Sequence, residues 1–199
     1  MPTVVVGGHS RNVGKTAVTA ALIRAFREYP WTAIKISSHQ HGNIQAFAHD
    51  RGLSAWHVYE ETNRDGASDT SRFLAAGAAR SYWMRMKGND PDDSLREILP
   101  FLRSSPFVII ESNRILSLIQ PDVCIMVLRF DIREFKESAR HALSRAHAAV
   151  VVNPYSVQPQ WEGVSNALSG IPQFAMRDPQ TIPAELIEFV RLKLRSGTS

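Results

Sequence analysis

The chain has 199 residues, of which 44% are hydrophobic and 21% are charged, with a formal net charge of +4. This length accommodates one domain with a sizeable core, so we expect a single domain over 1–195 and a frayed tail at 196–199. The single Cys124 excludes an internal disulfide, and its apolar neighbours predict a buried structural thiol. We expect no secretory leader, and the sequence has no apolar run long enough for a membrane span and no basic block. We therefore expect a cytoplasmic protein that binds neither membranes nor nucleic acid.

Short apolar runs alternate along the chain with segments of helical periodicity, which is typical of a sheet with helices on both faces. We predict an α/β fold of three layers, with a mostly parallel sheet of about seven strands. The strands are expected at Thr3–Val6, Thr32–Ile36, Arg80–Met84, Phe107–Glu111, Val123–Leu128, Ala148–Val152 and Gln173–Ala175. The helices are expected at Lys15–Phe26, Ser71–Ala76, Asp93–Arg103, Ile132–Arg145, Gln160–Ala167 and Ala184–Arg195.

The segment 38–68 lacks such a pattern. It is polar and contains four histidines and the turn-rich run Asn63–Ser68. A long loop without regular structure is unusual inside a compact domain and is often functional. We interpret this segment as a switch or substrate-binding region, with one short helix near Ile44–His49.

The first predicted strand leads into a polar turn flanked by glycines, and a helix follows. The turn Gly8-His9-Ser10-Arg11-Asn12-Val13-Gly14-Lys15-Thr16 reads G-x-x-x-x-x-G-K-T, a longer form of the phosphate-binding loop. Backbone N–H groups of such a loop and of the following helix bind a polyphosphate. The lysine reaches the β- and γ-phosphates, and the threonine hydroxyl ligates Mg²⁺. The residues predicted to hold a nucleoside triphosphate are Gly8, Ser10, Arg11, Asn12, Val13, Gly14, Lys15, Thr16 and Ala17.

Two acidic residues are candidates for the Mg²⁺ side of this site. Glu111 ends an apolar strand, and the carboxyl ends of parallel strands face the ligand crevice. Asp69 has two interpretations: Asp69 or Thr70 caps a short helix that Gly77 ends, or Asp69 approaches Mg²⁺ while Arg72 binds an anion. We predict a metal set of Thr16, Asp69 and Glu111 and a catalytic set of Lys15, Asp69 and Glu111.

Four further residues are candidates for contacts with substrate or base. Lys35 emerges near the end of the second strand, either as an exposed edge lysine or as a contact to a phosphate or an acidic substrate. His39 and His41 share a face of an extended segment, and we favour hydrogen bonds to substrate, or no role, over a metal site. Asn153 follows the sixth strand, where its amide is placed to read a purine edge or its Asn-Pro pair to form a turn.

The loop spacing is similar to that of dethiobiotin synthetases, within the SIMIBI branch of phosphate-loop (P-loop) NTPases. Ser10 stands where ParA/MinD-type ATPases carry an extra signature lysine, which disfavours that subgroup. Over more of the chain, the sequence resembles the molybdopterin-guanine dinucleotide biosynthesis protein B family. The resemblance rests on the end of the loop at Asn12–Thr16, on Lys35 followed by two histidines, and on Asp69-x-x-Arg72 before Ala76-Gly77-Ala78.

That resemblance implies a homodimeric GTP-binding adaptor with weak GTPase activity, which assists guanylyl transfer onto molybdopterin. Its implied partners are a molybdopterin nucleotidyltransferase or a molybdoenzyme, and its implied cofactors are Mg²⁺ and GTP. Two alternatives stay open: an ATP-dependent ligase or kinase of the dethiobiotin-synthetase type, acting on a small acid, and a nucleotide-dependent interaction switch. A preference for GTP or for ATP separates the first two functions.

Overall fold

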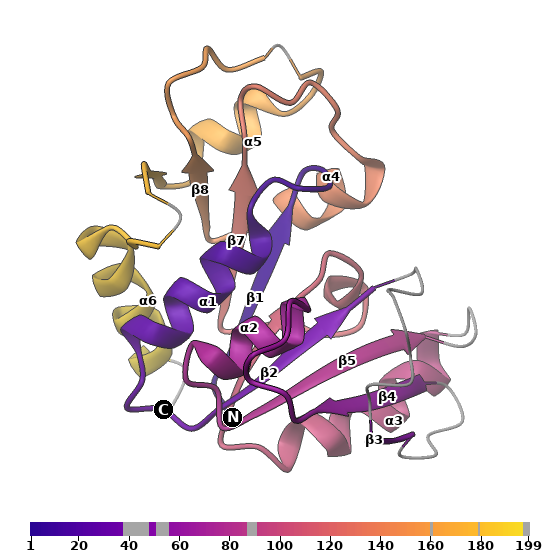
Figure 1. Ribbon diagram of the computed structural model, residues 1–199. Helices are drawn as coiled ribbons and strands as arrows, with labels where there is room; N and C mark the ends of the chain where they lie inside the picture. Colours follow the sequence, from indigo (N-terminus) through magenta and orange to yellow (C-terminus); the bar gives the residue numbers. More distant parts are fainter. Residues whose placement is uncertain (38–47, 51–55, 87–90, 160, 179, 197–199) are drawn as a thin grey trace.

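The computed structural model describes residues 1–37, 48–50, 56–86, 91–159, 161–178 and 180–196. In this part of the chain, helices cover both faces of a single sheet (Figure 1). The strands are β1 (Thr3–Gly8), β2 (Trp31–Ile36), β3 (Ala48–Asp50), β4 (Trp56–Glu61), β5 (Arg80–Met86), β6 (Phe107–Glu111), β7 (Val123–Leu128), β8 (Ala148–Val152) and β9 (Gln173–Met176). The helices are α1 (Lys15–Ala25), α2 (Asp69–Ala75), α3 (Pro91–Arg103), α4 (Glu137–Leu143), α5 (Ser165–Ser169), α6 (Ala184–Ser196) and the 3₁₀ turn η2 (Arg114–Ser117).

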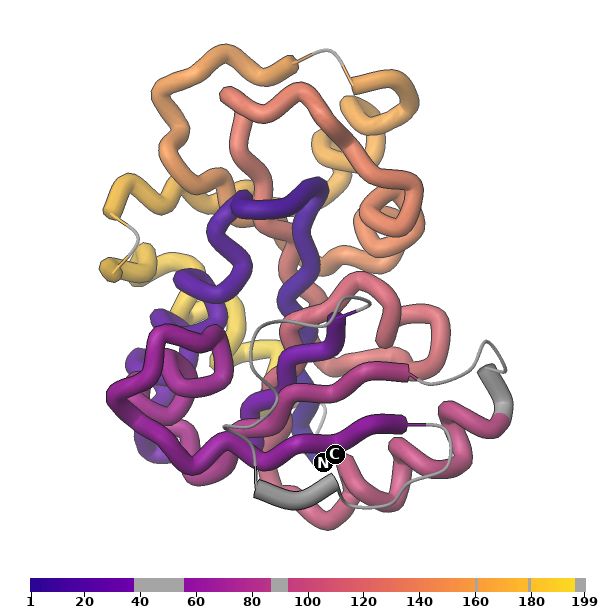
Figure 2. The backbone as a smooth tube through the Cα atoms, turned by 45° about the vertical axis from the view of Figure 1, so that its right-hand side comes forward, coloured from indigo at the N-terminus to yellow at the C-terminus, as the bar shows by residue number. Residues whose placement is uncertain are grey.

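The sheet has nine strands in the order β3-β4-β5-β2-β6-β1-β7-β8-β9. All seven predicted strands are present and pair in parallel, which confirms the predicted fold class. The two additional strands, β3 and β4, pair antiparallel at one edge. Figure 2 shows this edge, with β4 in purple, at the bottom of the molecule and the orange segments after β7 in the upper half.

Alternation along the central strands builds a core on each face of the sheet. Val4 and Val6 of β1 point into one core, where they meet Leu22 of α1 and Val190 of α6. Val5 points into the other core, which α3, α4 and α5 cover. The strand before the phosphate loop is therefore buried on both sides, and this fixes the position of the loop.

The segment 38–68 contains more regular structure than we predicted. Trp56 and Val58 of β4 are fully buried, and the Trp56 indole donates to the carbonyl of Ser94 at 3.0 Å. Residues 48–50 form β3, so the helix expected near Ile44–His49 is wrong there, and 44–47 lie outside the described residues. The polar flanks of this segment concealed the period-two pattern of Trp56 and Val58.

Two predicted helices begin later than expected. We predicted a helix at Ile132–Arg145, but α4 begins at Glu137. The residue before it, Lys136, is extended with ψ 148°, and its N–H donates to the carbonyl of His9 at 2.9 Å. The helix expected at Gln160–Ala167 is α5, which begins at Ser165. Before α4, the carbonyls of Arg133 and Glu134 and the N–H of Lys136 bond to distant residues, which helical periodicity cannot reveal.

The N-cap of α2 also differs from the prediction. Ser68, rather than Asp69 or Thr70, caps the helix, and its Oγ accepts from the N–H of Ser71 at 3.0 Å. The helix ends near Gly77 as predicted, where φ is 113°. Asp69 is the first residue of α2, and its carboxylate is therefore available for contacts outside the helix.

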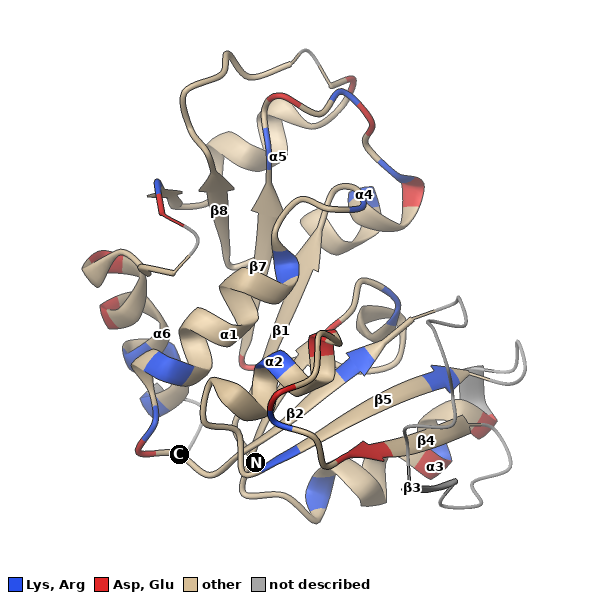
Figure 3. Cartoon of the chain, in the orientation of Figure 1, with Lys and Arg blue, Asp and Glu red and all other residues tan. Residues whose placement is uncertain are grey.

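The remaining composition-based expectations concern the thiol, the charges and membrane spans. Cys124 is buried in β7, and burial raises the pKa of its thiol to about 12, as expected of a structural cysteine. Lysine, arginine and acidic residues are distributed over the whole chain (Figure 3). Among the described residues, no helix is long and apolar enough to cross a membrane. The end of the expected tail, 197–199, lies outside the described residues, whereas Ser196 is the last residue of α6.

Candidate nucleotide-binding site

The turn between β1 and α1 has the backbone geometry that its two glycines allow. Gly14 precedes α1 with φ 101°, a left-handed conformation that side chains disfavour. A Cβ on Gly8 would lie 2.8 Å from Cγ of Lys15 and from Cγ2 of Val13. The first glycine therefore lets the loop fold back onto the stem of Lys15, and the second starts the helix.

Asn113, just beyond β6, holds the start of the loop through both groups of its side-chain amide. Its Oδ1 accepts from the N–H of Gly8 at 2.8 Å, and its Nδ2 donates to the Gly8 carbonyl at 2.9 Å. Our sequence reading gave this residue no role. A signal was present, because Asn113 lies two residues beyond the acid that ends the central strand.

His9 and Ser10 attach the loop to the segment between β7 and α4. The His9 imidazole donates from Nδ1 to the carbonyl of Glu134 at 2.7 Å and accepts at Nε2 from the N–H of Arg129 at 3.1 Å. Those partners require a neutral ring with its proton on Nδ1. The ring is fully buried between Phe135 and Trp161, with centroids 5.4 and 5.0 Å away.

The same segment contacts Ser10. The Ser10 hydroxyl donates to the carboxylate of Glu134, and this bond, with the positive charge of Lys136, lowers the pKa of Glu134. The sequence predicted Ser10 as a nucleotide contact and gave His9 no role. The partners of these two side chains lie 120 or more positions away, so no local pattern indicates the contacts.

Lys15 lies along the loop rather than away from it. Its ammonium donates to the carbonyl of Ser10 at 2.7 Å. Burial lowers the pKa of Lys15, and the nearby ammonium of Lys35 lowers it further, whereas Glu111 raises it. The ammonium is therefore held among backbone groups that would surround a bound phosphate.

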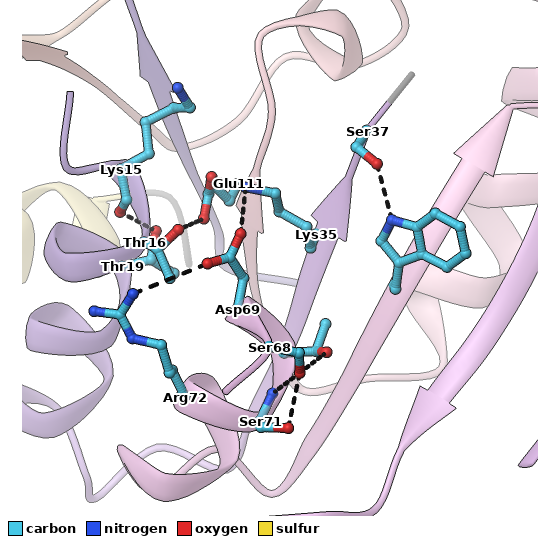
Figure 4. Close-up of polar contacts among 12 residues, drawn as sticks. Lys15, Thr16, Thr19, Lys35, Ser37, Ser68, Asp69, Ser71, Arg72 and Glu111 are labelled. Atoms are coloured by element: carbon cyan, nitrogen blue, oxygen red, sulfur yellow. Dashed lines mark hydrogen bonds and ion pairs between the residues drawn. The ribbon is translucent and has the colours of Figure 1, made fainter. Parts of the chain in front are cut away.

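Thr16, Lys35, Asp69 and Glu111 converge beside the loop, as Figure 4 shows. The Thr16 hydroxyl donates to Oε2 of Glu111 at 2.8 Å. The Lys35 ammonium lies 3.0 Å from Oδ2 of Asp69 and also contacts Oε1 of Glu111. We call these four residues the threonine–lysine–carboxylate cluster. They come from the start of α1, from β2, from the start of α2 and from the end of β6.

Burial and charge explain the electrostatics of this cluster. Only 1% of the Glu111 side chain and 13% of the Lys35 side chain are exposed. Burial disfavours the charged form of Lys35, but the two carboxylates outweigh it and raise the pKa of Lys35. Burial likewise disfavours the Asp69 carboxylate, but Lys35 outweighs it and lowers the pKa of Asp69. The ion pair between Lys35 and Asp69 is therefore formed over the whole neutral range.

The donor set fits a Mg²⁺ ion that a nucleotide brings with it. The Thr16 hydroxyl uses its proton on Glu111, which leaves its oxygen lone pairs for a cation. Asp69 and Glu111 supply hard oxygen donors on the same side. Among the described residues, no group of three or more His, Cys, Asp or Glu side chains could hold a metal. Phosphate and water oxygens would therefore complete the coordination, as Mg²⁺ prefers.

The other predicted site residues are more dispersed. Arg72 is half-exposed, and its guanidinium lies 4.0 Å from Oδ1 of Asp69. Asn153 follows β8 in a left-handed conformation with φ 53°, which suits a turn, and its contact with a base stays a prediction. Arg11 and Asn12 are exposed at the tip of the loop, Val13 is buried beneath it, and Ala17 lies in the first turn of α1. His39 and His41 lie outside the described residues.

Comparison with known proteins identifies the fold. No protein-family model matches the sequence, and no curated protein matches it. HypB from Helicobacter pylori, solved in complex with nickel, is 13% identical with a TM-score of 0.55, over 98% of this chain and 87% of HypB. A chain of the MinC:MinD cell division complex of Aquifex aeolicus is 10% identical with a TM-score of 0.54, over 97% of this chain and 86% of that chain.

A third similar structure is LpxK from Aquifex aeolicus in complex with ATP, which is 14% identical with a TM-score of 0.51. The match spans 94% of this chain but only 60% of LpxK. At these identities the comparisons establish the fold and not the activity. The chain shares the α/β fold of these three proteins.

Proposed function

We propose that the protein binds a nucleoside triphosphate together with Mg²⁺ and hydrolyses it slowly. The phosphates would lie on the N–H groups of residues 8–17, with Thr16, Glu111 and Asp69 on the metal side. The observation that carries the proposal is the convergence of Thr16, Asp69 and Glu111 beside a glycine-flanked loop at the start of α1.

The residues would act mainly by position and charge. Lys15 would leave the Ser10 carbonyl for a phosphate oxygen, because an anion is the stronger partner for a buried ammonium. Bound Mg²⁺ would offset the negative charge that develops on the phosphates. The described residues nearest to the loop place no histidine where it could abstract a proton, since both nitrogens of His9 are occupied. Slow turnover is the consequence we expect.

We further propose that GTP is the preferred nucleotide and that the protein acts as an adaptor in molybdenum-cofactor biosynthesis. The support is the sequence resemblance through Asn12–Thr16, Lys35 and Asp69-x-x-Arg72. A molybdopterin nucleotidyltransferase or a molybdoenzyme would then be the partner, and the protein would be a homodimer. Asn153 is our candidate for contact with the base, since it is exposed just beyond β8. Light scattering with and without nucleotide tests the dimer.

One observation favours a second function. Lys35 is held beside the metal-side acids, and the loop has the spacing of dethiobiotin synthetases. A small acid bound near Lys35 would receive the γ-phosphate of ATP, and the protein would be a ligase or kinase.

Competition between GTP and ATP for a fluorescent triphosphate analogue separates the two functions. Preferential displacement by GTP, with hydrolysis that small acids do not accelerate, supports the adaptor. Preferential displacement by ATP, with turnover that rises only when a small carboxylic acid is added, rejects the adaptor in favour of the ligase. The control variant is Asn153→Ala, which we expect to weaken the base preference without abolishing binding.

A further inference from the structure

Lys35 occupies a position between two carboxylates where a divalent cation would otherwise be attracted. Its ammonium lies 3.0 Å from Asp69 and also contacts Glu111, whose other oxygen accepts from Thr16. The side chain is only 13% exposed, so water screens these contacts weakly. The same carboxylates and hydroxyl form the donor set that we assigned to Mg²⁺.

The position of Lys35 is fixed by the sheet and not by a flexible loop. In the parallel pairing of β2 with β6, Lys35 is the direct partner of Glu111, and on the other side β2 pairs Lys35 with Trp83 of β5. Asp69 reaches the ammonium from the first residue of α2, whose cap is formed by Ser68. The lysine is therefore built into the site, and its four-carbon stem still lets the ammonium move.

The site carries no net negative charge. Lys15 and Lys35 contribute two positive charges, Asp69 and Glu111 contribute two negative charges, and the exposed Arg72 adds a positive charge 4.0 Å from Asp69. Such a site has little attraction for Mg²⁺ alone, because dehydration of this ion is unfavourable. A triphosphate changes the balance, since its oxygens ligate the metal and also offer the Lys35 ammonium a new anionic partner.

We propose that Lys35 takes the place of a divalent cation between Asp69 and Glu111 in the nucleotide-free protein, so that Mg²⁺ enters only together with a nucleoside triphosphate. The inference rests on the proposed nucleotide site and adds the condition under which that site binds Mg²⁺. The lysine prevents the acids from capturing a free cation, and it keeps the buried Glu111 paired until the nucleotide arrives.

The test uses the full chain without nucleotide and measures thermal unfolding against Mg²⁺ concentration at constant ionic strength. The wild-type protein should show no saturable rise in Tm. Lys35→Met removes the positive charge that lies between the two carboxylates, and we expect its Tm to rise with Mg²⁺ and its affinity for Mg²⁺ to increase at least about tenfold. A cation that binds the folded state and not the unfolded state raises Tm in this way.

Three variants serve as controls. Lys35→Arg keeps the charge and should not respond to Mg²⁺. Lys193→Met removes the same charge from α6, away from the cluster, and should behave as wild type. The double variant Lys35→Met/Asp69→Asn removes one positive and one negative charge, so its net charge equals that of the wild type, and it should lose the response of Lys35→Met. A purely structural lysine would predict no Mg²⁺ response in any of these proteins.

Saturable binding of Mg²⁺ to the nucleotide-free wild type, as tight as to Lys35→Met, would overturn the inference. So would a Lys35→Met protein that folds and ignores Mg²⁺. If that variant does not fold, calorimetric titration of the wild type with Mg²⁺ replaces the experiment. Saturable binding heat in the absence of nucleotide rejects the inference. Saturable binding heat that is seen only in the presence of GTP or ATP supports it. Failure to bind any nucleotide would reject the proposed function separately, because the nucleotide-free titrations do not depend on it.

Discussion

His9 illustrates how a single residue connects the phosphate loop to a distant part of the chain. Its ring is fully buried, and it donates to Glu134 and accepts from Arg129. Burial lowers the pKa of His9, and the positive charge of Lys15 lowers it further, although the carbonyl of Glu134 opposes both effects. The folded state therefore favours the neutral imidazole.

This shift gives a prediction for stability against pH. Because the folded pKa of His9 lies below its ordinary 6.5, the unfolded chain takes up the proton first as pH falls. The stabilisation that the neutral His9 ring contributes is complete above 6.5 and is lost as pH falls through the folded pKa. We expect the free energy of unfolding to decrease from pH 7 to pH 5 and His9→Gln to reduce this decrease.

Chemical denaturation across that pH range measures the effect. His147 also has a lowered pKa through burial, so His147→Gln serves as the matched control, and the double variant should be the flattest. Identical pH slopes in wild type and His9→Gln would contradict the assignment of a buried neutral ring.

Among single residues, the sequence predicted those whose roles follow from local motifs. Lys15, Thr16 and Glu111 were expected at the site because a strand, a loop and a helix have fixed spacings, and the structure brings them together. His9 and Asn113 were missed as functional residues. Their partners come from other elements, and a single sequence holds no record of such contacts.

Among the elements of the fold, β6 and the phosphate loop are joined by Asn113, which lies just beyond β6 and bonds to Gly8. Asn113→Ala removes both hydrogen bonds to Gly8 and leaves the N–H and the carbonyl of Gly8 without these partners. We expect a loss of about 1–3 kcal/mol in the free energy of unfolding and weaker nucleotide binding. Asn166→Ala on the exposed surface of α5 is the control and should change neither quantity.

Hydrogen exchange provides the direct readout for the loop. The Gly8 amide should exchange faster in Asn113→Ala than in wild type, because its acceptor is removed. Unchanged protection of Gly8 together with unchanged stability would show that Asn113 does not hold the loop.

Elements were predictable where hydrophobic periodicity dominates. The predicted bounds of β6, β7 and β8 match the structure, since these strands are continuous apolar runs except for Glu111 at the end of β6. The prediction for α4 was wrong at its start because Glu134 and the extended Lys136 both bond to His9. Strand β4 was missed because three of its six residues, His57, Glu60 and Glu61, carry polar or charged side chains.

At the scale of the whole molecule, we expect one cooperative unfolding transition for the domain proposed at 1–195. Adjacent residues of β1 contribute to the cores on opposite faces of the sheet, so neither core can open alone. Trp31 reports on one core, and Trp56 and Trp161 report on the other. Tryptophan fluorescence and far-ultraviolet circular dichroism should therefore give the same midpoint in denaturant. Two separate midpoints would indicate more than one folding unit.

Calorimetric titration with non-hydrolysable GTP and ATP analogues, with and without Mg²⁺, tests the central claim most directly. The proposal predicts saturable, Mg²⁺-dependent binding to the wild type and a loss of at least about tenfold in affinity for Lys15→Ala, since that variant lacks the charged partner of the phosphates. Lys193→Ala, on α6, should bind as the wild type does. Absence of binding to the wild type, or equal binding to Lys15→Ala, would contradict the assignment of this loop as the nucleotide site.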